Sequence, residues 1–329
     1  MSVKQATKIL KDLKIVNEAT KHLMAGLVMR DRGEGNFLNE FQKAKQLVPS
    51  HPGVKYLMNE LKNFRNVDVS NIEKSDFNTL IRQGKVLLEN RIYDKAAVVF
   101  EKAEMLNPKS SIVHYNLGVV YYHQGLFFKA LSQLNDALRV RSDHAPSYNM
   151  RGLVFFAKNQ RKRAISDFSM ALSLDNDYWL ALNNRGIAYA SEGEFEMALK
   201  DFSRAIKLKE DYAEAYFNRG LLYQTRANRS DNLKKTEFKK AISDYTKAIT
   251  LDPDYNKAYC NRGMIYAMEG QFALAISDFD KVIELTPDKA DAYYNRGLAY
   301  YLSKNILKAK RDFEKAIKID PEYKKKVPY

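Results

Sequence analysis

Apolar residues recur at helical spacing along most of the chain, in paired segments separated by short polar turns. One such pair reads Ala258-Tyr-Cys-Asn-Arg-Gly-Met-Ile-Tyr-Ala267 and then Phe272-Ala-Leu-Ala-Ile-Ser-Asp-Phe279. Residues that recur every three to four positions share one face of an α-helix. The pattern therefore predicts an all-α chain of paired amphipathic helices. Gly125, Gly193 and Gly270 fall in the breaks, where a left-handed residue ends a helix at little cost.

Small residues recur along this pattern with a fixed period. The glycines that share it are Gly84, Gly118, Gly152, Gly186, Gly220, Gly263 and Gly297, which lie 34 residues apart except for one interval of 43. Twelve residues after six of these glycines stands an alanine, and four residues after that alanine stands phenylalanine or leucine. Such a period indicates a repeat architecture, in which each repeat buries its apolar faces only against its neighbours.

The repeated units can be delimited in the sequence. They are residues 77–110, 111–144, 145–178, 179–212, 213–255, 256–289 and 290–323, and the fifth holds nine extra residues. Proline closes four of them, as Pro108, Pro253, Pro287 and Pro321. This pattern resembles the tetratricopeptide repeat family, whose signature is a helix-turn-helix of about 34 residues with small residues at these places. The resemblance implies a right-handed α-α superhelix, an elongated solenoid with a concave groove.

The residues outside the seven units are less regular. We interpret residues 1–76 as an N-terminal helical region, in which residues 18–51 form a degenerate repeat and residues 67–75 a linker. Residues 324–329 form a short basic tail. Solenoids need a polar cap on the last repeat, and none follows here. Self-association through this uncapped C-terminal repeat is therefore one expectation.

Opposite charges recur together at two places of the repeat. Arginine directly precedes the period glycine in five units, and in the same five units aspartate directly precedes the aromatic residue of the second helix. This predicts a structural ion pair between the two helices of one repeat, with the planar guanidinium fixing their register. The predicted pairs are Arg151 with Asp167, Arg185 with Asp201, Arg219 with Asp244, Arg262 with Asp278, and Arg296 with Asp312. Pairing with the adjacent repeat fits the sequence less well, because Gln133 would then face Arg151.

Asparagine recurs two residues before the period glycine. A carboxamide has an acceptor and two donors, so it can hold the main chain of a peptide of any sequence. In the tetratricopeptide family this face of the first helix lines the concave groove, and the superhelix of O-linked N-acetylglucosamine transferase has a similar ladder. The resemblance implies a peptide-binding groove made by Asn116, Asn184, Asn218, Asn261, Asn295, Tyr115, Phe217, Tyr294, Tyr122 and Tyr301. The alternative is that the asparagines bond to neighbouring repeats.

Charge bears on the choice of partner. The chain has 54 lysine and arginine residues against 40 aspartate and glutamate residues, a net charge of +14, which favours acidic partners. The segment Arg226–Lys240 spans the extra residues of the fifth unit and holds six basic and two acidic residues. It is a candidate contact for an acidic surface. The alternative is a tolerated surface insertion, because lengthening a loop costs little.

The residues needed for catalysis are not found together in the sequence. The five histidines lack the spacing of metal ligands, and neither a phosphate-binding glycine loop nor a nucleophile elbow occurs. Cys260, the single cysteine, is expected to line the groove or pack in the fold. We therefore expect no enzyme, no metal and no cofactor. No apolar run approaches the roughly 18 residues of a membrane span, so we expect a cytoplasmic protein without membrane insertion, with a nuclear or cytoskeletal location left open.

These observations favour a non-enzymatic scaffold for protein–protein interaction, which binds an extended or helical partner segment in the groove. An architectural component of a larger assembly, such as a cytoskeletal one, is the alternative. An RNA-binding helical-repeat protein is disfavoured, because the basic residues form no stripe along the groove. A co-chaperone that binds chaperone tails is also disfavoured, because most of the corresponding groove places hold apolar residues.

Overall fold

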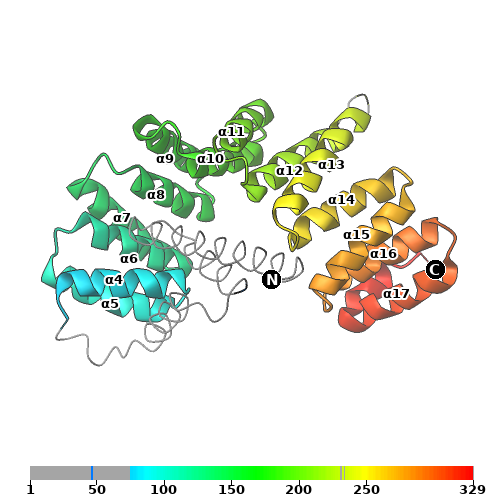
Figure 1. Cartoon of the computed structure of the whole chain (residues 1–329), viewed down its shortest axis with the longest axis horizontal. Helices are drawn as coiled ribbons and strands as arrows, with labels where there is room; N and C mark the ends of the chain where they lie inside the picture. Colours follow the sequence, from blue (N-terminus) through cyan, green and yellow to red (C-terminus); the bar gives the residue numbers. More distant parts are fainter. Residues whose placement is uncertain (1–45, 47–74, 230–231, 233, 329) are drawn as a thin grey trace, which may run out of the picture. The chain divides into compact units, whose positions relative to one another are not determined.

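The computed structural model describes residues 46, 75–229, 232 and 234–328 (Figure 1). Within these residues the chain forms fourteen α-helices, α4 to α17, and no strand, which confirms the all-α prediction. The chain divides into two compact units, Met1–Val154 and Phe155–Tyr329. Apart from Gln46 and Ser75, the predicted degenerate repeat at 18–51 and the linker at 67–75 lie outside the described residues.

The first unit is a stack of helical hairpins. It contains α4 (Phe77–Glu89), α5 (Tyr93–Leu106), α6 (Ser111–His123), α7 (Phe127–Val140) and the start of α8 (Ala145–Ala157). Asp76 caps α4, because its carboxylate accepts a hydrogen bond from the Thr79 amide at 3.0 Å. From α4 to α7 each helix packs against the next along the chain. The core between them is continuous and is centred on the fully buried Leu80, Phe100 and Leu134.

The second unit continues the same plan. After the end of α8 it contains α9 (Arg161–Leu174), α10 (Trp179–Glu192), α11 (Phe195–Leu208), α12 (Ala213–Arg229), α13 (Lys234–Leu251), α14 (Asn256–Met268), α15 (Phe272–Leu285), α16 (Ala290–Leu302), α17 (Ile306–Ile319) and the 3₁₀ helix η2 (Pro321–Lys325). From α9 to α17 each helix again packs against the next. Each unit is thus a solenoid of hairpins that are stacked in sequence order.

The period glycines lie where the two helices of a hairpin approach most closely. A Cβ atom at Gly84 would stand 2.5 Å from the ring of Phe100, and one at Gly186 would stand 2.7 Å from the ring of Phe202. In both hairpins this ring stands sixteen residues after the glycine, on the second helix, and fills the space beside it. This close contact explains why glycine is needed at a helical position where alanine is otherwise preferred.

In each described hairpin other than the one formed by α12 and α13, the turn contains one residue in the left-handed conformation. Gly125, Gly193 and Gly270 have φ angles of 74°, 84° and 75°, as predicted. Arg91, Asn159 and Lys304 adopt the same conformation in three other hairpins, with φ of 60° to 64°. Because this turn sets the angle between the two helices, the unfavourable conformation is accepted there even without glycine.

Candidate functional site

The first helices of successive hairpins lie next to one another. Helix α10 contacts α12 and α14 contacts α16 in the second unit, as α4 contacts α6 in the first. Positions spaced four, three and four residues apart share one face of each of these helices. In the second unit we call this face the first-helix stripe: Leu180, Asn184, Ile187 and Ser191 of α10; Glu214, Asn218, Leu221 and Thr225 of α12; Lys257, Asn261, Met264 and Met268 of α14; Asp291, Asn295, Leu298 and Leu302 of α16. None of these sixteen residues is buried.

The middle of the first-helix stripe carries no charge and combines one asparagine with one aliphatic residue on each helix. Directly after each period glycine stands an aliphatic residue, namely Ile187, Leu221, Met264 or Leu298, and Leu221 is 42% exposed. A cavity of about 250 Å³ opens between α10, α11 and α12 and is lined by Ile187, Ala190, Phe195, Phe202, Asn218, Leu221, Leu222 and Thr225. The Thr225 hydroxyl is used within its own helix, because it donates to the Leu221 carbonyl at 2.8 Å. Most of the other lining side chains are apolar, so this cavity can take an apolar side chain.

The amide groups of three predicted groove asparagines serve the fold itself. Asn218 Nδ2 donates to Oδ1 of Asn183 in the preceding repeat at 2.9 Å, and Asn183 is only 1% exposed. Asn261 Nδ2 lies 3.4 Å from the Tyr245 hydroxyl, also in the preceding repeat. Asn116 is buried and donates to the Ile112 carbonyl of its own helix at 2.8 Å. For Asn218 and Asn261 this supports the alternative of bonding to a neighbouring repeat. Asn184 and Asn295 are half-buried on the stripe.

Two of the predicted groove aromatics lie against other parts of the fold. Phe217 is only 8% exposed and packs on Tyr245 and Tyr255, with ring centroids 5.7 Å and 5.1 Å away, so its assignment to the groove was wrong. In that turn of α12 it is the neighbouring residue, Asn218, that lies on the first-helix stripe. The Tyr294 hydroxyl donates to the Lys326 carbonyl at 3.0 Å, and its ring packs on Tyr323, so the C-terminal segment lies over it.

The other three predicted aromatics remain partly exposed. Tyr115 makes an edge contact with His144 at 5.2 Å, and burial raises the pKa of its hydroxyl. Tyr122 packs against His123 and Phe127. Tyr301 is half-buried. Of these, only Tyr301 belongs to a first helix of the second unit, so it alone adjoins the first-helix stripe.

Four of the five predicted ion pairs are present. Arg185 donates from Nε and Nη2 to the two carboxylate oxygens of Asp201 at 2.7 Å and 2.8 Å. The same two-bond arrangement joins Arg219 to Asp244, Arg262 to Asp278 and Arg296 to Asp312. The aspartates are buried. Arg151 and Asp167 belong to different compact units, and their pairing stays a prediction.

The same arginines also bond to the preceding repeat, which the sequence analysis missed. Arg185 Nη1 donates to the Ser169 hydroxyl at 3.1 Å, and Arg262 Nη1 to the Thr246 hydroxyl at 2.9 Å. The equivalent acceptors are Asn135 for Arg151, Ser203 for Arg219 and Asp280 for Arg296. Each acceptor directly follows the leucine or aromatic residue of the second helix. A small polar residue at that fixed place of the second helix is the sequence signal that could have revealed the contact to the preceding repeat. Arg185, Arg219, Arg262 and Arg296 therefore each join two helices of one repeat and one helix of the repeat before it.

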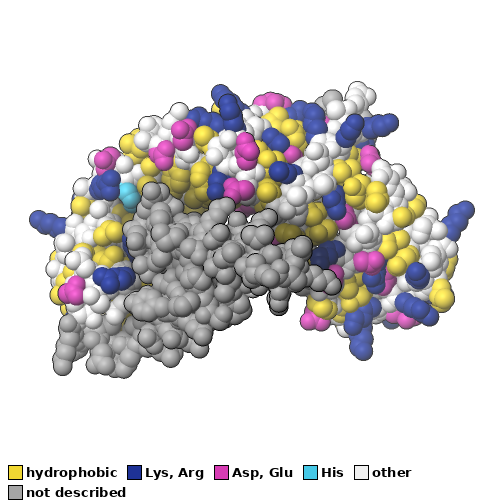
Figure 2. Space-filling view, in the orientation of Figure 1, with side chains coloured by type: hydrophobic (Ala, Val, Ile, Leu, Met, Phe, Trp, Pro, Cys, Tyr) yellow, Lys and Arg dark blue, Asp and Glu magenta, His cyan; other side chains and the backbone are white. Residues whose placement is uncertain are grey.

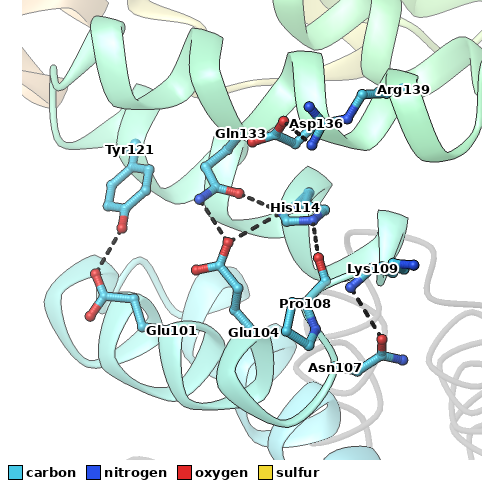
Figure 3. Close-up of polar contacts among 10 residues, drawn as sticks. All are labelled: Glu101, Glu104, Asn107, Pro108, Lys109, His114, Tyr121, Gln133, Asp136 and Arg139. Atoms are coloured by element: carbon cyan, nitrogen blue, oxygen red, sulfur yellow. Dashed lines mark hydrogen bonds and ion pairs between the residues drawn. The ribbon is translucent and has the colours of Figure 1, made fainter.

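The junction between the first two repeats uses different residues (Figure 3). His114 is buried, and its two ring nitrogens lie 2.7 Å from Gln133 Oε1 and 2.9 Å from the Pro108 carbonyl oxygen. Gln133 Nε2 donates to Glu104 at 3.0 Å. The Tyr121 hydroxyl donates to Glu101 at 2.7 Å. Gln133 stands at the place of the later aspartates, whereas the place of the arginine holds the buried Leu117.

The comparisons with known proteins agree with this geometry. A family model described as TPR repeat matches residues 186–225, 234–270 and 265–303, and models described as tetratricopeptide repeat match residues 81–148 and 290–323. Together these matches cover more than half of the chain. The chain belongs to the tetratricopeptide repeat family. The fold of this family indicates a scaffold for protein–protein interaction. No curated protein matches the chain.

Solved structures of tetratricopeptide-like solenoids share the fold. A monomeric mutant of IFIT1 with m7Gppp-AAAA has a TM-score of 0.63 at 17% identity, over 91% of this chain and 77% of that chain. The APC/C hetero-tetramer Cut9–Hcn1 has a TM-score of 0.63 at 16% identity, over 87% and 55%. A tetratricopeptide repeat protein from Parabacteroides merdae has a TM-score of 0.54 at 21% identity, over 76% and 96%. At these identities the likeness concerns the fold alone.

The fifth tetratricopeptide repeat departs from the family pattern. The two family matches on either side leave out residues 226–233, which lie within the extra segment. In the structure both helices of this repeat are longer than the others: α12 ends at Arg229 and has 17 residues, and α13 begins at Lys234 and has 18, against 13 or 14 in every other helix from α4 to α17. The predicted surface insertion is therefore a helical extension of one repeat.

The last tetratricopeptide repeat is covered by a segment that the sequence analysis did not foresee. The 3₁₀ helix η2 packs against α17 and buries Tyr323. The Tyr323 hydroxyl donates to Asp291. The expectation of an uncapped C-terminal repeat was therefore wrong, because η2 covers part of its terminal face.

Potential metal ligands do not cluster among the described residues. No group of three histidine, cysteine, aspartate or glutamate side chains in that part of the chain gathers to hold a metal ion. Cys260 is half-buried, and burial raises the pKa of its thiol, which opposes nucleophilic reactivity. None of the helices described has the length and apolar character that a bilayer crossing requires.

Proposed function

We propose that this tetratricopeptide repeat protein is a non-enzymatic scaffold that holds an extended or helical segment of a partner protein on the first-helix stripe of its second unit. The observation that carries the proposal is the uncharged middle of the stripe, with an aliphatic residue on each helix, together with the cavity beside Leu221. Peptide-binding sites commonly combine an apolar pocket for an anchor side chain with polar groups that engage the main chain.

The asparagines contribute to this site through their remaining carbonyl oxygens. Asn218 donates its Nδ2 to Asn183, and this bond fixes the orientation of the carboxamide. A side-chain oxygen held in this way at the lining of the cavity can accept a hydrogen bond from a peptide N–H. We propose that the apolar cavity supplies most of the affinity and that the asparagine oxygens orient the bound main chain.

The test uses peptides selected for binding to the immobilised full chain from a random phage-displayed library. Their affinity is measured by calorimetry for the wild type, for Leu221→Glu and for Leu208→Glu. Leu208 is a matched control, because it is 38% exposed against 42% for Leu221 but lies at the end of the second helix α11. We expect Leu221→Glu to weaken binding by about tenfold or more and Leu208→Glu to leave it unchanged. Equal loss in both variants, or loss in neither, contradicts the proposal.

A further inference from the structure

The extension of the fifth repeat is a built part of the fold. Ala227 and Phe238 are buried inside it. The guanidinium of Arg229 lies over the ring of Phe195 in α11, 4.6 Å from its centroid. Arg226 Nη1 lies 2.9 Å from Glu196, also in α11. These contacts hold the described residues of the extension, and the side chains that they carry, in defined places.

The extension presents its positive charge outward. Its acidic residue Glu237 is buried, and its carboxylate lies 2.8 Å from Lys240 Nζ and 3.4 Å from Arg226 Nε. These two cations compensate the charge of the buried carboxylate, whose Oε1 accepts a hydrogen bond from Lys240 while Oε2 has no hydrogen-bond partner. Lys235 and Lys239 are exposed one helical turn apart on α13, and neither has an acidic partner among the described residues. Figure 2 shows lysine and arginine side chains gathered where α12 ends and α13 begins.

These two lysines border a surface depression. Its volume is about 480 Å³, and it is lined by Lys235, Lys239, Ile242, Tyr266, Glu269 and Gln271. Ile242 and Tyr266 supply apolar surface. Gln271 Nε2 donates to Glu269 at 3.2 Å, and the guanidinium of Arg262 lies 5.8 Å from the ring centroid of Tyr266. The depression thus combines two ammonium groups that have no acidic partner in the described part of the chain, one carboxylate, and an apolar floor, and it lies outside the first-helix stripe.

We propose that this depression between α13 and the α14–α15 turn is a second docking surface, which takes an acidic segment of a partner protein. The carboxylates of such a segment meet Lys235 and Lys239, and a neighbouring apolar side chain covers Ile242. A nucleic acid fits less well, because Arg262 engages the Tyr266 ring, which leaves that ring less free to stack on a base. Glu269 repels carboxylates and phosphates alike and does not distinguish the two kinds of partner. Charge complementarity between the two lysines and the carboxylates of the segment selects the partner, and this attraction weakens as the salt concentration rises.

The test measures fluorescence anisotropy with the full chain and two labelled probes. One is a peptide that alternates glutamate with leucine and phenylalanine, and the other is an oligouridylate of the same length. Lys235→Glu with Lys239→Glu is compared with Lys200→Glu with Lys207→Glu, which makes the same charge change at exposed positions of α11. We expect the first double variant to weaken peptide binding by about tenfold and the control to change it little. Leu221→Glu should leave this binding unchanged, which separates it from binding on the stripe.

Three results would overturn the proposal. The first is that the wild type does not bind the peptide. The second is an equal loss in both charge-reversal variants, which would indicate attraction by the net charge of the whole chain. The third is tighter binding of the oligouridylate that disappears in the Lys235 and Lys239 variant, which would assign the surface to nucleic acid. Lys235→Ala with Lys239→Ala repeats the measurement without reversing the charge, and circular dichroism checks that each variant is folded.

Discussion

Arg219 and Asp244 are joined by two parallel hydrogen bonds, each 2.8 Å long, between α12 and α13. The hydrogen bonds that Arg219 donates to the Asp244 carboxylate hold the pKa of the guanidinium above its ordinary value. The third guanidinium contact reaches the Ser203 hydroxyl of the preceding repeat at 3.2 Å. One side chain therefore fixes the register of its own hairpin and the packing of that hairpin on the one before it.

Removing one partner of this pair should cost more than removing both. Arg219→Leu or Asp244→Leu leaves a charge stranded in a largely buried site, and each should lower the free energy of unfolding by about 3 kcal/mol. The double variant should cost clearly less than either single variant. Urea unfolding of the four proteins gives the coupling energy. The exposed pair Lys209–Asp211 is the control, and its cycle should give no more than about 1 kcal/mol.

The bond between Asn218 and Asn183 should contribute to stability without any ligand. Asn218→Ala removes the donor and leaves the buried Asn183 oxygen unsatisfied, at an expected cost of about 1–2 kcal/mol. Thermal and urea unfolding of the unliganded chain measure this cost. An unchanged stability, together with weaker binding of a selected peptide, would show that the asparagine acts mainly on the ligand.

The close contact between Gly186 and Phe202 should not tolerate a methyl group. Gly186→Ala places a Cβ atom 2.7 Å from the ring, and the resulting overpacking should cost about 1–3 kcal/mol. Trp179 lies on the same helix and is the single tryptophan of the chain, so its fluorescence reports on this hairpin. For Gly193→Ala nothing lies within 4 Å of the new atom. Only the left-handed backbone opposes that change, at about 1–2 kcal/mol.

Glu89 at the end of α4 should make the first unit less stable as pH rises. Burial raises the pKa of Glu89 from 4.5 to about 7, and Lys85 only partly opposes this. Between pH 4.5 and 7 the unfolded chain therefore releases a proton that the folded chain retains. The unfolded state gains free energy from this release, so stability should fall across this window and level off above it. Glu89→Gln should remove this slope, which urea unfolding at a series of pH values would reveal.

The helices and their turns could be predicted because they depend on contacts within one repeat. Gly186 and Phe202 are fixed by the space between two neighbouring helices, and Gly193 by the backbone of one turn. The pairs of arginine and aspartate could also be predicted from the sequence, because both residues are present together or absent together in each unit. These features repeat at constant spacing, so the chain itself provides several examples of each.

The surroundings of the first-helix stripe could not be predicted in the same way. Whether Asn218 faces a ligand or Asn183 depends on how two repeats are packed, and the family resemblance alone favoured the ligand. Ser169 and Thr246 look like ordinary surface residues until a guanidinium is found beside them. The burial of Phe217 depends on Tyr255, which belongs to the loop before the next repeat. The role of Tyr323 depends on a short 3₁₀ helix with no counterpart in the other units.

Arg185, Arg219 and Arg262 each bond to a hydroxyl at the same place of the preceding hairpin. One of these contacts between repeats can therefore replace another. Excision of residues 179–212 would bring Arg219 opposite Ser169, which offers the same hydroxyl group as Ser203 at the same place. A chain built in this way can lose or duplicate a whole repeat, and the newly adjacent repeats can still form the same hydrogen bond between arginine and hydroxyl. The chain can therefore gain or lose whole repeats, and with them positions on the first-helix stripe, without new residues at the contacts between repeats.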